Sequence, residues 1–127
     1  YIVAQEFECP IFAPSMGRRI ENEEIVPNLT HYPYLNWNQW IKTLASHKYA
    51  IHMMPTIAAG TFAMNCAFHG IPCMGDIEKA RELAIKLKND KKFLENCSES
   101  CKLNYEQSFS EEVFVKHMKK VFKLGEL

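Results

Sequence analysis

Secondary structure is encoded most clearly in the stretch Pro55-Thr-Ile-Ala-Ala-Gly60-Thr-Phe-Ala-Met-Asn65-Cys-Ala-Phe-His-Gly70-Ile-Pro-Cys-Met-Gly75. It follows an apolar run, Tyr49-Ala-Ile-His-Met-Met54, which is typical of a buried strand. Small residues at 58–60 predict a turn, the segment that ends at Gly70 predicts a helix, and the residues from Ile71 to Met74 predict a second short strand. A strand, a helix and a strand in this order predict a βαβ unit.

The turn of this unit is a candidate anion site. Small residues let a ligand approach the backbone, and the free N–H groups at the start of a helix attract phosphate. Gly60 and Thr61 would provide that helix start. Neither the dinucleotide fingerprint G-x-G-x-x-G nor the P-loop pattern G-x-x-x-x-G-K-S/T occurs. The spacing alone therefore leaves two interpretations open, a phosphate site and an empty turn.

The order of elements around this unit resembles the C-terminal, nucleotide-sugar-binding half of GT-B glycosyltransferases. The matching features are a helix from Trp37 to His47, the strand from Tyr49 to Met54, Pro55, the small-residue turn with Gly60, and a helix that closes with Gly70-Ile-Pro72. The resemblance extends from Leu29 to Phe122, and its specific part from Tyr32 to Gly75. At Gly75-Asp76 the sequence departs from the family, which usually carries a longer loop with further donor contacts there.

The resemblance implies a donor site with three parts. Gly60 and Thr61 would face the diphosphate of the donor. Asn65, one helical turn later, would hold the ribose hydroxyls. Many members carry a glutamate at that position, and an amide can also hydrogen-bond a hydroxyl group. Tyr34 and Leu35 would form the wall of the nucleobase site.

The implied reaction is transfer of a sugar from a nucleotide-sugar to an acceptor hydroxyl, with the donor as substrate and no separate cofactor. The helix dipole and the N–H groups at Gly60 and Thr61 would stabilise the leaving diphosphate, which is the role of a metal in other transferases. The sequence has no aspartate-rich metal motif. The acceptor site and the general base would lie in a second glycosyltransferase domain or partner chain. No catalytic residue is therefore assigned, and this chain is not expected to catalyse transfer alone.

Length and composition predict one domain over residues 1–127. A chain of 127 residues with 47% hydrophobic residues can form a core, but it is too short for a two-domain GT-B enzyme. Fifteen basic and fifteen acidic residues give a formal charge of zero, which removes the electrostatic argument for nucleic acid or an anionic membrane as partner. The sequence has no apolar segment near the roughly 18 residues of a membrane span and no signal-peptide pattern. Together with five irregularly spaced cysteines, this favours a cytoplasmic protein.

The C-terminal half predicts three helices. Asp76 would cap the first, whose apolar positions are Ile77, Ala80, Leu83, Ala84 and Leu87. The second would run from Phe93 to Tyr105, and Ser110 would cap the third. The apolar stripe of the third comprises Val113, Phe114, His117, Met118, Val121 and Phe122.

Cys97 and Cys101 lie four residues apart on the second of these helices. They could bind a metal together with a residue such as His117. They also belong to a helical stripe with Leu94 and Tyr105, and we favour this interpretation as buried thiols.

The N-terminal third carries weaker signals. The residues from Tyr1 to Ala4 and from Cys9 to Ala13 suit two strands, and a polar loop follows. Another strand end is expected within Thr30 to Leu35. Asn36 and Gln39 then have the spacing of a capping box for the helix that begins at Trp37. Trp37, Trp40 and Leu44 are expected to pack this helix into the core.

These patterns predict an α/β fold with a short, mostly parallel Rossmann-type sheet flanked by helices and a helical C-terminal portion. The functional prediction is a glycosyltransferase donor-binding domain. Two alternatives stay open. One is a non-catalytic nucleotide-binding module on the same fold, and the other is a protein-interaction module that docks a partner through the face from Val113 to Phe122.

Overall fold

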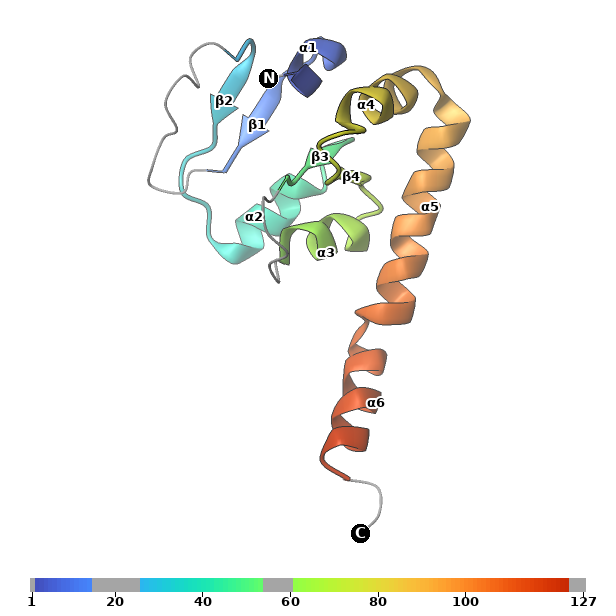
Figure 1. Ribbon diagram of the computed structural model, residues 1–127. Helices are drawn as coiled ribbons and strands as arrows, with labels where there is room; N and C mark the ends of the chain where they lie inside the picture. The colour runs from blue at the N-terminus through green and yellow to red at the C-terminus, as the bar shows by residue number, and fades with distance from the viewer. Residues whose placement is uncertain (1, 15–25, 54–60, 124–127) are drawn as a thin grey trace.

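The computed structural model describes residues 2–14, 26–53 and 61–123, and Figure 1 shows their arrangement. The chain is α/β. Its elements, in order, are α1 (Ile2–Phe7), β1 (Ile11–Ala13), β2 (Leu29–His31), α2 (Trp37–Leu44), β3 (Ala50–Ile51), α3 (Thr61–Phe68), β4 (Cys73–Met74), α4 (Ala80–Asn89), α5 (Lys91–Ser108) and α6 (Glu111–Val121).

The predicted βαβ unit is present as β3, α3 and β4. β3 and β4 pair in parallel, with Ala50 opposite Cys73 and Ile51 opposite Met74. β1 and β2 also pair in parallel, from Ile11 opposite Leu29 onward. Within the described residues these are two separate two-stranded sheets, where the sequence predicted one. The parallel pairing is therefore as expected, and a continuous Rossmann-type sheet is not formed by these four strands.

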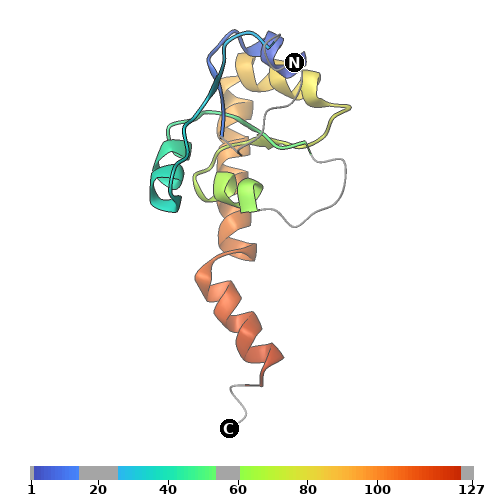
Figure 2. The same ribbon diagram turned by 90° about the vertical axis from the view of Figure 1, so that its left-hand side faces the viewer.

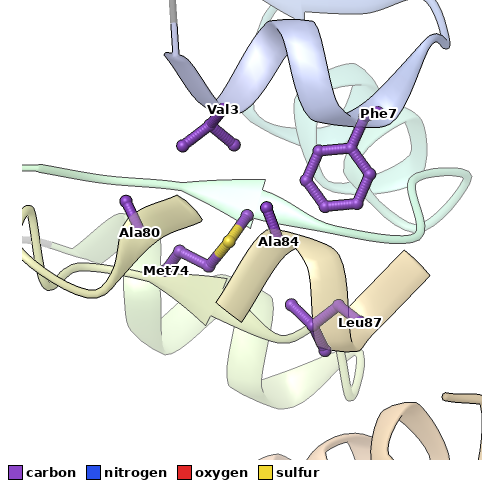
Figure 3. Close-up of a cluster of buried hydrophobic side chains, with 6 residues drawn as sticks. All are labelled: Val3, Phe7, Met74, Ala80, Ala84 and Leu87. Carbon is purple, nitrogen blue, oxygen red and sulfur yellow. The ribbon is translucent and has the colours of Figure 1, made fainter. Parts of the chain in front are cut away.

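Helices cover both faces of the β3–β4 pair. Met74 belongs to a buried cluster with residues of α1 and α4, and Figure 3 shows these side chains meeting. Ala50, whose side chain points to the opposite face, belongs to a second cluster with Leu44 of α2 and Cys66 of α3. Each cluster buries side chains from one face of β3–β4, and this double cover explains why these short strands are almost entirely apolar.

The N-terminal segment is a helix, so the strand predicted from Tyr1 to Ala4 is wrong. Val3 and Phe7 are four residues apart and are both buried, at 6% and 9% exposure. A helix places residues at this spacing on one face, and here that face packs on α4 (Figure 3). Packing on α4 thus overrides the strand propensity of the β-branched residues.

Asp76 caps a turn, and α4 starts four residues later than the predicted cap, at Ala80. The Asp76 carboxylate accepts hydrogen bonds from the N–H groups of Glu78 and Lys79, at 3.0 and 3.2 Å. Ile77 is consequently 65% exposed and is not a core residue. The other predicted positions of this helix do face the core: Ala80, Ala84 and Leu87 are buried, and Leu83 packs against the same cluster.

The last helix starts at its predicted cap, Ser110, whereas α5 starts at Lys91, two residues before the predicted Phe93, with Asp90 as its cap. Asp90 accepts a hydrogen bond from the N–H of Phe93 at the start of α5, and Ser110 accepts one from the N–H of Val113 at the start of α6. α5 packs along α3 and α4, whereas α6 extends away from the rest of the structure in both views (Figures 1 and 2). No helix among the described residues is long and apolar enough to cross a membrane.

Candidate functional site

A cavity of about 470 Å³ lies between the segment that precedes α2 and the first turn of α3. Four of the five predicted donor-site residues line it: Tyr34, Leu35, Thr61 and Asn65. The fifth, Gly60, lies outside the described residues. The structure thus brings together residues from two segments that are well separated in the sequence.

Local structure fixes both walls of this cavity. Tyr34 and Leu35 directly precede the capping box of α2, which is present as predicted. The N–H of Gln39 donates to Asn36 Oδ1 and the N–H of Asn36 donates to Gln39 Oε1, both at 3.0 Å. Opposite, Thr61 and Asn65 are four residues apart on α3, so their side chains lie on one face of that helix.

Asn65 is the most informative polar group of the cavity. It is 7% exposed, lines the cavity, and makes no side-chain hydrogen bond to another described residue. Among the described residues, the only fully buried side-chain polar atom without a partner is His69 Nε2, so the Asn65 amide is not a sealed, unpaired group. At the wall of a cavity, an amide can accept a hydrogen bond from a ligand hydroxyl and donate one to it.

Aromatic side chains form much of the remaining lining. Trp40 stacks on Phe62 with ring centroids 6.1 Å apart, and His52 lies 5.4 Å from the same phenyl ring. Tyr34 and Trp37 are exposed at the cavity, so the prediction that Trp37 packs into the core is wrong. Trp37 is the first residue of α2 and lies outside the core, which buries Leu44 at the other end of the helix.

The cavity suits an anion or a neutral polar ligand. None of its described lining residues is an aspartate or a glutamate, so a phosphate group would meet no carboxylate. Thr61 is the first described residue of α3, and the N–H groups and dipole at the start of a helix favour negative charge. His52 also lines the cavity, although it was not predicted as a site residue; its position directly after β3, next to the βαβ turn, is the signal that could have identified it.

The cysteines are separate from this cavity. Cys66 is fully buried, and its thiol donates a hydrogen bond to the sulfur of Cys73. This bond and burial raise the pKa of Cys66, and the same bond lowers the pKa of Cys73. Cys97 and Cys101 are half-buried, as the helical stripe predicted, and burial raises the pKa of both thiols. His117 is exposed on α6, and across residues 2–14, 26–53 and 61–123 no three metal-ligating side chains are grouped for a metal ion.

No known protein family, curated protein or solved structure matches this chain. The functional interpretation therefore depends on the cavity and on the sequence resemblance.

Proposed function

We propose that this chain is the donor-binding domain of a GT-B glycosyltransferase, with a Rossmann-type core, and that it binds a nucleotide-sugar for transfer to an acceptor hydroxyl. One observation carries the proposal. Four of the five residues to which the resemblance gives roles in binding the base, the ribose and the diphosphate line one cavity, although they come from separate segments. Its volume of about 470 Å³ is within the usual range for small-molecule sites.

The lining supports an orientation for the ligand. The nucleobase stacks against the aromatic wall near Tyr34 and Trp37, because aromatic faces bind bases of any type. The ribose hydroxyls pair with the buried amide of Asn65. The diphosphate then reaches Thr61 at the start of α3, where backbone N–H groups stabilise the charge that develops when the glycosidic bond breaks.

The acceptor and the general base belong, in this proposal, to a second domain or a partner chain in the cytoplasm. The chain by itself then binds the donor without turnover. Donor binding by this chain can therefore be measured without catalysis, and it is the first property to test.

A calorimetric titration with UDP, GDP and inorganic phosphate tests the proposal. Thr61→Asp places a carboxylate where the diphosphate is proposed to lie, and an acidic residue in the first turn of a helix favours folding. Lys91→Asp makes a larger charge change at the first residue of α5, away from the cavity, and is the matched control. We expect one nucleoside diphosphate to bind the native chain and the Lys91→Asp variant, and Thr61→Asp to lose that binding while folded.

Two other results would favour other functions. Binding that the complete protein never converts to turnover would indicate a non-catalytic nucleotide-binding module. A folded chain that binds no nucleotide would favour the protein-interaction module. The observation that favours this alternative is the exposed apolar face of α6. Phe114, Val121 and Phe122 on that face are 61%, 71% and 61% exposed.

A further inference from the structure

A second cavity, of about 850 Å³, separates the two sheets. It is lined by every residue of β1 and of β3, and by no residue of β2. Within the described residues β1 pairs only with β2, and β3 pairs only with β4. The cavity is therefore bordered by two strand edges that have no partner strand among these residues.

The backbone hydrogen bonds of β1 identify which groups point into this space. The N–H of Ile11 donates to the carbonyl of Asn28 at 2.9 Å, and the carbonyl of Ala13 accepts from the N–H of Tyr32 at 2.8 Å. Ile11 and Ala13 thus direct their backbone groups toward β2. Because successive residues of a strand use opposite edges, Phe12 directs its N–H and carbonyl away from β2.

β3 has the same arrangement. The N–H groups of Ala50 and His52 donate to the carbonyls of Pro72 and Met74, at 2.9 and 3.0 Å, so both residues face β4. Ile51, between them, directs its backbone groups to the opposite edge. Phe12 and Ile51 are also half-exposed, at 41% and 42%, although both line an apolar cavity.

We propose that an extended apolar strand from outside these 127 residues binds between β1 and β3 and joins the two sheets into one. Its N–H and carbonyl groups pair with those of Phe12 on one side and Ile51 on the other. Unpaired edge strands are templates for this kind of strand addition, in which main-chain hydrogen bonds provide the affinity.

The lining indicates the chemistry of this strand. Phe7 and Met74 approach the cavity from the cluster formed with α1 and α4, and Leu44 and Phe62 approach it from the cluster formed with α2 and α3. A strand with both faces covered is a nearly continuous run of valine, isoleucine and leucine. The occupant is thus a short, predominantly apolar segment, and Lys48 and Lys88 lie at the same cavity.

Hydrogen exchange of the ¹⁵N-labelled chain tests this inference. The probe is a capped synthetic peptide with about five consecutive valine and isoleucine residues between terminal lysines, the usual length of a strand. We expect the peptide to slow exchange of the Phe12 and Ile51 amides at least about tenfold, because both amides become hydrogen-bonded. The same peptide with N-methylated backbone amides should give no protection.

Proline variants make the test specific to the backbone. Phe12→Pro removes an N–H that β2 does not use, so the β1–β2 pair persists while peptide binding weakens at least about tenfold. Phe12→Ala keeps the N–H and is the matched control for the lost side chain. Ile51→Pro provides the same test on β3 if Phe12→Pro fails to fold.

Three results would overturn the inference. The first is unchanged exchange at Phe12 and Ile51 up to the solubility limit of the peptide. The second is equal peptide binding by the proline and alanine variants. The third is protection of both amides in the chain alone, with dimers in solution, which would assign the edge to a second copy. None of these depends on nucleotide binding, so the inference and the proposed donor site can fail separately.

Discussion

Replacement of Asn65 by leucine should make the chain more stable and its ligand binding weaker. The residue is 7% exposed at the cavity, and no hydrogen bond joins its side chain to another described residue. Leucine has the same number of side-chain non-hydrogen atoms and no polar group to desolvate. Because apolar surface replaces a mostly buried amide, we expect the free energy of unfolding to rise by up to about 1 kcal/mol. For a chain of this length, that corresponds to a melting temperature higher by up to about 4 °C.

Urea unfolding followed by circular dichroism measures this change, and an unchanged m-value shows that the midpoint shift reflects stability. Asn96→Leu, at an exposed position on α5, is the matched control and should stay within about 0.5 kcal/mol of the native chain. A loss of more than about 1 kcal/mol in Asn65→Leu would refute the reasoning. It would mean that the amide is paired within the chain and is not available to a ligand.

The same variant should bind the nucleoside diphosphate about threefold to tenfold more weakly, because one neutral hydrogen bond contributes about 0.5–1.5 kcal/mol. Calorimetry under the conditions used for the native chain measures this ratio. Higher stability combined with weaker binding is the signature of a polar group retained for a ligand. Equal affinity in the two proteins would remove Asn65 from the proposed site.

Three further predictions concern the framework around the site. Leu44→Ala, at a position 3% exposed, should lower the free energy of unfolding by about 2–5 kcal/mol in urea titrations, and a loss below about 1 kcal/mol would contradict the described core. Gly70→Ala should cost about 1–2 kcal/mol, since φ is +68° and a Cβ would lie 2.9 Å from Ser98 Oγ. Gly75→Ala, where the nearest atom would be 3.6 Å away, is its control and should be close to neutral in the same titrations. Burial and the raised pKa of Cys66 should leave this thiol unmodified by iodoacetamide at pH 8 until the chain unfolds, and mass spectrometry would show early alkylation if that environment is wrong.

The sequence predicted secondary structure best where local signals and packing agree. The βαβ unit combines an apolar run with a helix that is followed by Gly70, whose positive φ favours glycine, and the two strands flank that helix in the sequence. The caps at Asn36 and Ser110 depend on short-range hydrogen bonds and were predicted from spacing alone. The position of Asn65 in the cavity follows from the same unit.

Elements decided by distant contacts were predicted poorly. α1 is a helix because Val3 and Phe7 pack on α4, and nothing within the first residues indicates that contact. Ile77 has an apolar side chain at a plausible helical position, yet the Asp76 turn delays the start of α4 and leaves it exposed. The exposure of Trp37 likewise depends on where α2 meets the core. Apolar character alone did not show which of these residues become buried.

Chemical-shift mapping of the ¹⁵N-labelled chain with UDP and GDP is the most direct test of the proposed donor site. The proposal predicts that one nucleotide shifts the amide signals of Tyr34, Leu35, Thr61 and Asn65 together, in a saturable way, while signals of α6 stay in place. Shifts confined to another part of the chain, or no saturable shift from a folded sample, would contradict the assignment of this cavity as a nucleotide-sugar site.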